Sequence, residues 1–155
     1  MIKIILPLIF LSSPVFGETL KNNYDKLNEA YAKCTNLERD ADLSNVNNEW
    51  LQSLSDRDQI IVLRSISRKA YDNCVKPESL IFSYDIVRAA INGDSKPLDN
   101  YIKLMELSNT QIELDKKFSQ FNPDKIKTLL NNPLLNQPFN ARTAFEQINN
   151  RDYTP

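Results

Sequence analysis

The sequence predicts an all-α protein, a single compact bundle of six or seven helices with one disulfide. Along most of its 155 residues, apolar side chains recur three and four positions apart, which is the spacing of one face of an α-helix. The chain holds only two glycines, Gly17 and Gly93, so it has few residues suited to the tight turns of β-hairpins. No segment alternates apolar and polar residues over the length of a strand.

The N-terminal half is expected to form three helices, over residues 19–34, 44–54 and 55–74. Ser55 starts the third helix, because a serine followed three positions later by the acidic Asp58 has the form of a helix N-cap. The residues expected on the inner faces of these helices are Leu20, Tyr24, Leu27, Tyr31, Val46, Trp50, Leu51, Leu54, Ile60, Leu63 and Ile66.

Prolines mark the helix starts in the C-terminal half. A helix over residues 77–92 carries apolar side chains around most of its circumference, so it is expected to lie at the centre of the bundle. Gly93 ends this helix, since glycine adopts the left-handed conformation of a helix C′ residue without steric cost. The remaining helices are expected over residues 97–121, with a break at 108–110, and over residues 123–130 and 140–148.

Residues 1–17 have the order of a cleavable secretory signal. Lys3 precedes an apolar segment over residues 4–11, and Val15 and Gly17 occupy the −3 and −1 positions of a signal-peptidase site. The apolar segment is shorter than the roughly 20 residues of a membrane span. No cysteine follows the cut, so the lipid anchor of a bacterial lipoprotein is not expected.

The mature chain, residues 18–155, is expected to be one soluble helical domain in the periplasm or outside the cell. The full sequence carries 19 lysines and arginines against 20 aspartates and glutamates, and Lys3 leaves with the signal. A nearly neutral chain lacks the basic excess of nucleic-acid-binding proteins. The expected partner is therefore a protein, with no nucleic acid and no integral membrane segment after signal cleavage. Unpaired apolar groups on a helical surface would also suit a homodimer.

The two cysteines, Cys34 and Cys74, are expected to form one structural disulfide. An exported protein meets an oxidising compartment, which favours a disulfide over free thiols. The chain has no histidine and no Cys-x-x-Cys spacing, so a zinc site and a thioredoxin-like redox site both lack parts. Each cysteine ends a predicted helix. An up-down-up path would bring the two helix C-termini side by side, within the roughly 7 Å between Cα atoms that a disulfide requires.

The residues of the common catalytic sites are missing. Without histidine, neither a Ser-His-Asp nor a Cys-His arrangement can form, and glycine-rich phosphate loops need glycines that this chain lacks. No catalytic residue, metal ligand or cofactor is therefore assigned. One enzymatic alternative remains, a hydrolase that uses carboxylates alone. Its best local cluster is Glu38, Asp40 and Asp42, in the expected loop after Cys34.

The most ordered charge pattern lies on the third predicted helix. Arg57, Arg64 and Arg68 are seven and four positions apart, which places them in one narrow stripe bordered by Ile61 and Tyr71. Arginine donates planar, bidentate hydrogen bonds to carboxylates, and it is enriched with tyrosine at the centres of protein interfaces. The stripe is the first candidate surface for an acidic partner. The alternative is a solvated flank paired with acidic residues of its own and neighbouring helices.

The second candidate surface is the C-terminal segment over residues 133–139, whose apolar residues are Leu134, Leu135 and Phe139. Two interpretations are open: the segment covers the core of its own domain, or it presents apolar groups to a partner. The first is favoured, because apolar loops beside prolines usually pack on their own domain. Truncation at Asn132 would separate the two.

These observations favour an exported protein–protein interaction module of the cell envelope. Examples of this class are an immunity or inhibitor protein and an accessory protein of a secretion or pilus machine. One alternative is a secreted effector that binds host or competitor lipid or protein, and it differs in location. The other is the carboxylate-only hydrolase, which would require turnover that is lost on Asp40→Asn or Asp42→Asn.

Overall fold

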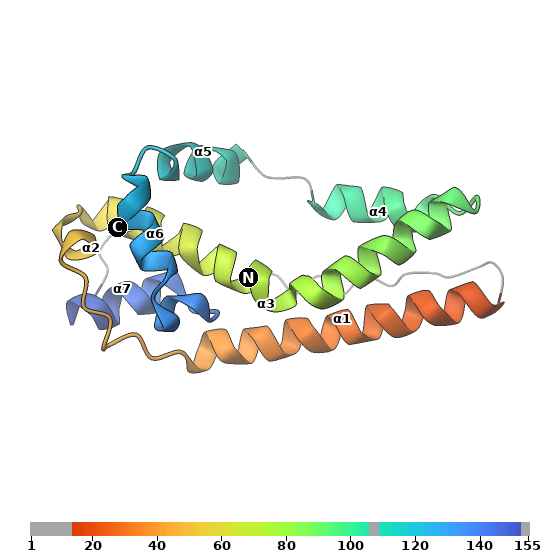
Figure 1. Ribbon diagram of the computed structural model, residues 1–155, viewed down its shortest axis with the longest axis horizontal. Helices are drawn as coiled ribbons and strands as arrows, with labels where there is room; N and C mark the ends of the chain where they lie inside the picture. The colour runs from red at the N-terminus through yellow and green to blue at the C-terminus, as the bar shows by residue number, and fades with distance from the viewer. Residues whose placement is uncertain (1–13, 106–108, 153–155) are drawn as a thin grey trace. The chain divides into compact units, whose positions relative to one another are not determined.

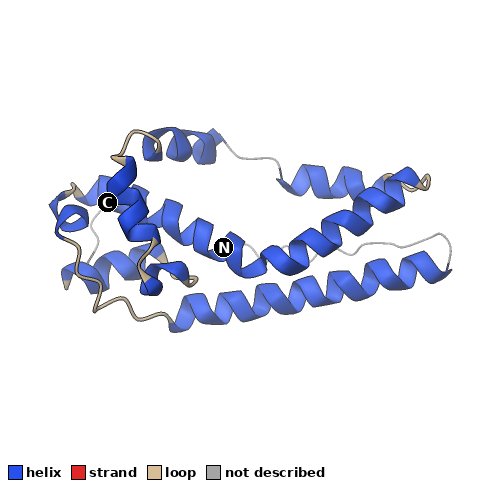
Figure 2. Cartoon of the chain, in the orientation of Figure 1, coloured by secondary structure: helices blue, strands red, loops and turns tan. Residues whose placement is uncertain are grey.

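The computed structural model describes residues 14–105 and 109–152, and every regular element in these residues is helical (Figure 2). The predicted all-α class is confirmed, with seven α-helices, a short 3₁₀ helix and one disulfide in the described residues. The elements are α1 (Pro14–Asp40), α2 (Glu49–Ser53), α3 (Asp56–Ile91), α4 (Lys96–Met105), α5 (Asn109–Phe118), α6 (Pro123–Leu130), the 3₁₀ helix η1 (Pro133–Asn136) and α7 (Ala141–Asn149).

The chain divides into two compact units, and α1 and α3 contribute to both (Figure 1). The first unit comprises Met1–Glu29 and Pro77–Glu106, so it holds the N-terminal part of α1, the C-terminal part of α3, and α4. The second unit comprises Ala30–Lys76 and Leu107–Pro155, which includes the other parts of α1 and α3 and all the remaining helices.

Helices α1 and α3 are both longer than the sequence pattern predicts. No glycine or proline follows Cys34 before Asp40, so α1 continues for six residues past the expected end. Pro77 was expected to open a new helix, and this prediction was wrong because α3 runs through it. A proline inside a helix removes one backbone hydrogen bond. Here α3 carries buried side chains on both sides of the proline, Val75 before it and Phe82 after it, and this packing outweighs the local signal.

Asparagine side chains cap most of the shorter helices. Asn48, Asn122, Asn132 and Asn140 each accept a hydrogen bond from a backbone amide in the first turn of α2, α6, η1 and α7 respectively. Such caps satisfy amide groups that have no partner within the helix. The N-cap of α3 is Ser55, as predicted, and its hydroxyl accepts from the Asp58 amide at 3.2 Å. Gly93 follows α3 with φ at +96°, which confirms its predicted role.

The core of the second unit is built from side chains of α2, α3, α6, η1 and α7 and of the loops before α2 and after η1. Phe139 and Phe145 are its largest members, and both have at most 1% of their surface exposed. The loop before α2 contributes Leu43 and Val46 to this core, and the loop after η1 contributes Phe139. The fully assembled cluster contains Leu43, Val46, Leu51, Ile60, Val62, Leu63, Ile66, Ile126, Leu129, Leu135, Phe139, Ala144, Phe145 and Ile148.

The first unit has a smaller core between α1, α3 and α4. Its buried members are Leu20 and Leu27 of α1 with Phe82 and Ile86 of α3. The prediction that residues 77–92 form a central helix was wrong, because α3 is covered on one side only in this unit. The exposed apolar residues of this part of α3 are Leu80, Ile81, Tyr84, Val87 and Ile91.

The predicted secretory signal falls largely outside the described residues. Residues 1–13 are not described, while Pro14 and Gly17 belong to the first turns of α1. Cleavage after Gly17 therefore stays a prediction. None of the helices in residues 14–105 and 109–152 combines the length and the apolar character needed to cross a membrane.

Candidate functional site

The predicted disulfide is present in the second unit. Cys34 and Cys74 are bonded with their Cα atoms 6.1 Å apart, and Cys34 is buried. The prediction that the bond joins two parallel helix C-termini was wrong. Both cysteines lie inside their helices. In this unit α1 and α3 run in opposite directions (Figure 1), and the Thr35 hydroxyl of α1 is hydrogen-bonded to the Tyr71 hydroxyl of α3. The disulfide therefore links two neighbouring antiparallel helices at positions inside both helices.

Tyr71 belongs to the contact between α1 and α3. Its ring stacks on Tyr31, with ring centroids 6.3 Å apart, and its hydroxyl lies 3.0 Å from the Thr35 hydroxyl. It also donates to the Tyr31 carbonyl at 3.3 Å. The predicted interface residue Tyr71 therefore supports the packing beside the disulfide and does not line the groove described next.

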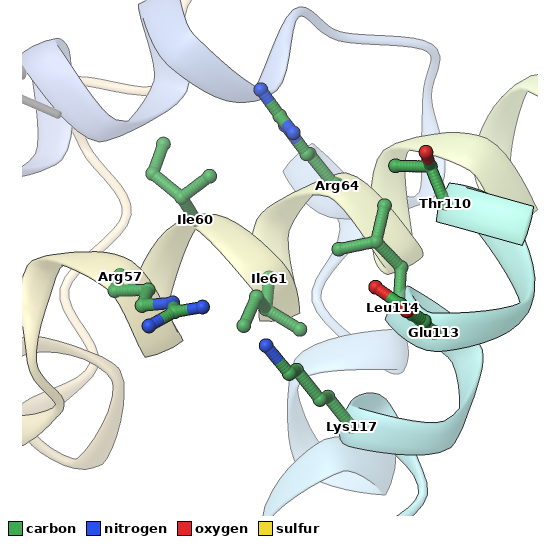
Figure 3. A pocket seen from close by; sticks show the side chains of 8 residues that line it. All are labelled: Arg57, Ile60, Ile61, Arg64, Thr110, Glu113, Leu114 and Lys117. Atoms are coloured by element: carbon green, nitrogen blue, oxygen red, sulfur yellow. The ribbon is translucent and has the colours of Figure 1, made fainter.

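A groove of about 260 Å³ lies between α3 and α5 in the second unit (Figure 3). Four residues from successive turns of α3 form one wall, and four residues of α5 form the other. Two predicted partner-binding residues, Arg57 and Arg64, belong to the α3 wall. The complete lining is Arg57, Ile60, Ile61, Arg64, Thr110, Glu113, Leu114 and Lys117.

The groove has an apolar floor. Ile60 and Ile61 are each 5% exposed, and Leu114 is half-buried on the α5 side. Figure 3 shows Ile61 close to the ends of the Arg57 and Lys117 side chains, so apolar and charged groups lie next to one another in the lining. A floor of branched aliphatic residues with a charged rim can accept an apolar side chain and an ionic group from one bound segment.

The rim carries three cations and one anion. In Figure 3 the Arg57 guanidinium and the Lys117 ammonium both extend toward Ile61, while the Arg64 side chain extends away from Lys117. Among the described residues, no carboxylate lies within ion-pair distance of Arg57, Arg64 or Lys117. Only Glu113 offsets these charges within the groove lining, so the rim is cationic.

Arg68, the third arginine of the predicted stripe, has a different role. Its Nη2 donates to Asp115 Oδ1 of α5 at 2.6 Å, and Gln111 donates to the same oxygen at 3.1 Å. The hydrogen bond from Arg68 lowers the pKa of the Asp115 carboxyl. Arg68 therefore fastens α5 to α3, and the stripe divides into two groove residues and one residue of a helix–helix contact.

Lys117 and Glu113 are groove residues that the sequence reasoning missed. They lie on α5, more than forty residues from Arg64 along the chain, and only the folding of α5 onto α3 brings them to the groove. The charges of residues 113–117 alternate in sequence, which is also the pattern of an ordinary exposed helix. No local signal separates the two cases.

The C-terminal segment covers its own domain. Leu135 and Phe139 are at most 1% exposed, and the Phe139 carbonyl accepts a hydrogen bond from the Ser67 hydroxyl at 2.5 Å. Assigning these two residues to a partner-binding surface was therefore wrong, and the packing interpretation holds for them. Leu134 stays at the surface, 38% exposed.

The three carboxylates considered for hydrolysis are engaged in different local contacts. Glu38 and Asp40 lie in the last turn of α1 and not in a loop. Asp40 pairs with its neighbour Arg39, and Asp42 accepts a hydrogen bond from the Ser44 amide. In the part of the chain that the structure describes, no group of three or more His, Cys, Asp or Glu side chains could hold a metal ion.

Glu38 provides a pH-dependent test of the second unit. Burial raises the pKa of its carboxyl, so the folded protein binds this proton more tightly than the unfolded chain does. Protonation of Glu38 contributes its full stabilisation when the pH is below the pKa that this carboxyl has in the unfolded chain. This contribution is lost as the pH rises through the higher pKa of the carboxyl in the folded protein. We expect Glu38→Gln to raise the free energy of unfolding at pH 7, and to change it less at pH 4.

Urea unfolding of the variant and of the unchanged protein at the two pH values checks this expectation. Glu29→Gln, at an exposed position of the same helix, is the matched control. Equal stabilisation at pH 4 and pH 7 would show that the effect of Glu38→Gln does not arise from the buried charge.

Comparison with known proteins gives no further assignment: no protein-family model, no curated protein and no solved structure matches this chain.

Proposed function

We propose that this protein is an exported protein–protein interaction module of the cell envelope, and that it binds an acidic segment of its partner in the groove between α3 and α5. The observation that carries the proposal is the cationic rim of Arg57, Arg64 and Lys117 around an apolar floor. Immunity and inhibitor proteins and accessory proteins of secretion or pilus machines belong to this class.

The size and chemistry of the groove favour a protein segment over a small molecule. Pockets for small molecules typically measure about 300–1,000 Å³ and enclose most of the ligand, whereas this groove measures about 260 Å³. It is large enough for one or two side chains of a longer segment. Guanidinium groups beside aliphatic side chains suit a segment that places Asp or Glu next to Leu, Ile or Val.

Export is the second part of the proposal. The disulfide and the lack of a membrane-spanning helix in the described residues are compatible with a protein outside the cytoplasm. The predicted signal at residues 1–17 supports a periplasmic or secreted location. A secreted effector would use the same groove, and the location of the protein distinguishes it from an envelope protein.

Charge reversal in the groove tests the proposal. We expect Arg57→Glu combined with Arg64→Glu to weaken partner binding at least tenfold, because two attractive contacts become repulsive and like charges face each other. Both arginines are exposed, so the fold should be retained. The measurement is quantitative affinity capture from envelope and culture supernatant, with the unchanged protein and the variant run in parallel.

A matched control keeps the net-charge change the same. Lys125→Glu combined with Lys127→Glu reverses two exposed cations on α6, outside the groove lining. The expected partner is a protein that is captured by the unchanged chain and by this control, but not by the groove variant. The amount captured should fall as the salt concentration rises. Equal capture by all three chains would contradict the proposal. Arg68 is left unchanged, because its removal would also break the contact with Asp115.

A further inference from the structure

The first unit exposes a continuous apolar stripe on α3. Leu80, Tyr84, Val87 and Ile91 follow one another at intervals of four, three and four residues, so they lie on one helix face. Their exposed fractions are 60%, 66%, 47% and 81%. Ile81, 52% exposed, lies beside them. These five residues are called the α3 stripe below.

The other side of the same helix segment is fully used. Phe82 and Ile86 pack against α1, and the Asp85 carboxylate accepts a hydrogen bond from Asn23 at 2.5 Å. Tyr101 of α4 contacts the Phe82 ring edge-on and bonds to the Ser83 hydroxyl. This part of α3 therefore has two apolar faces, of which α1 and α4 cover one. A helix that is apolar all round is normally buried all round.

We propose that a second copy of this chain covers the α3 stripe, with the two α3 segments packed antiparallel about a two-fold axis. A branched aliphatic side chain offers on the order of 100 Å² of apolar surface, so the partly exposed stripe offers roughly 300–400 Å², comparable to the largest patch on a typical monomer. Two stripes and the polar residues at their borders together approach the roughly 1,000 Å² at which specific interfaces begin.

The composition of the stripe favours a second copy over an unlike partner. None of the five stripe residues is charged, so the surface does not require a partner of opposite charge. An apolar stripe is complementary to itself, which is the requirement of a two-fold interface where the same patch meets on both subunits. The interface is near the lower size limit, so the dimer is expected to dissociate in the micromolar range.

The residue order favours the antiparallel direction. With the two-fold axis between Tyr84 and Val87, Tyr84 faces the smaller Val87 of the second copy, and Leu80 faces Ile91. In a parallel pair each residue would face its own copy, so the two large Tyr84 rings would meet and the two smaller Val87 side chains would meet.

Sedimentation equilibrium of the full chain, purified as the host cell processes it, tests the dimer. We expect a monomer–dimer equilibrium, and we expect Tyr84→Glu or Val87→Glu to raise the dissociation constant at least a hundredfold. Ile112→Glu is the matched control, because Ile112 is an apolar residue of α5 that is 53% exposed and lies outside the stripe. Circular dichroism establishes that each variant is folded.

A monomer at about 100 µM, well above a micromolar dissociation constant, would overturn the proposal. So would a dimer that persists in both stripe variants. Binding of the monomer to neutral phosphatidylcholine vesicles that is lost with Tyr84→Glu would assign the stripe to a lipid surface and overturn the dimer. The result is separable from the groove proposal, because dimerisation through apolar contacts should survive high salt, whereas groove binding should not.

Cross-linking tests the direction of the helices. In the antiparallel pair, Val87→Cys lies near its own copy across the two-fold axis and should cross-link to itself with a short bis-maleimide. Ile91→Cys should not, since the two copies are displaced by eleven residues, or about 16 Å along the axis. It should instead cross-link to Leu80→Cys in a mixed sample. Self-cross-linking of Leu80→Cys and Ile91→Cys, each alone, would show a parallel pair and contradict the proposed arrangement.

Discussion

Replacing Cys34 and Cys74 with alanine is expected to lower the free energy of unfolding by about 4 kcal/mol. The bond closes a loop with a sequence separation of 40 residues. In the chain-entropy account, a link across a loop of this length restricts the unfolded chain by roughly that amount. Domains are typically stable by about 5–15 kcal/mol, so the loss would remove a large share of the total. Alanine is preferred to serine because Cys34 is buried, and a hydroxyl there would need a partner.

Urea unfolding of the oxidised protein, the reduced protein and the double-alanine variant measures this effect. The free energies of unfolding of the reduced protein and of the variant should differ only by the packing contribution of the two sulfur atoms that the variant lacks. The variant should still fold, because the Tyr31–Tyr71 stack and the hydrogen bonds of Tyr71 also join α1 to α3. A loss below about 1 kcal/mol would mean that the unfolded chain already holds these segments together.

The pairing of the cysteines was predictable from the sequence, but its setting was not. Two cysteines allow only one bond within a chain, so composition settled the pair. The prediction placed Cys74 at a helix end because Pro77 suggested a new start after it, and α1 was also expected to end too early, at Cys34. A proline at that position suits either a first turn or a kink inside a longer helix. Only the packing of the residues before and after it decides between the two.

The same limit applies to the groove. Arg57 and Arg64 could be selected from sequence, since their spacing on one helix is a local property. The different role of Arg68 depends on Asp115, which lies 47 residues away. Lys117 reaches the groove by the same long-range contact between α5 and α3. The spacing of residues within α3 or within α5 does not reveal long-range contacts of this kind.

The apolar residues of 77–92 show what periodicity can and cannot give. Their pattern covers nearly the whole circumference, so it indicates that apolar side chains point to more than one side of the helix. It does not indicate which face the rest of the chain covers. Phe82 and Ile86 are buried while Tyr84 and Ile91 are exposed, although all four are apolar or aromatic and close in sequence.

Removal of the C-terminal segment is expected to have the largest effect of all. A chain that ends at Asn132 loses Leu135, Phe139, Ala144, Phe145 and Ile148, which are five of the fourteen buried residues in the core of the second unit. Burial of a large apolar side chain contributes about 1.5–3 kcal/mol. Four such side chains and an alanine therefore contribute about as much as the whole stability of a typical domain.

We expect the shortened chain to lose the fold of the second unit, measured as loss of cooperative thermal unfolding and of protected amides in hydrogen exchange. A chain that ends at Asp152 is the control, because it keeps α7 and the ion pair between Arg151 and Asp56. Phe145→Ala provides a graded form of the test, with an expected loss of about 3–5 kcal/mol for a buried aromatic residue.

The outcome also separates the two interpretations of this segment. If it covers the core, truncation and Phe145→Ala both destabilise, and partner binding falls only in proportion to the unfolded fraction. If it instead docked a partner, the shortened chain would stay folded and lose binding alone. The complete burial of Leu135 and Phe145 and the hydrogen bond from Ser67 to the Phe139 carbonyl favour the first outcome. Leu134 is the exception: as an exposed residue of η1, its change to alanine should leave stability within about 0.5 kcal/mol.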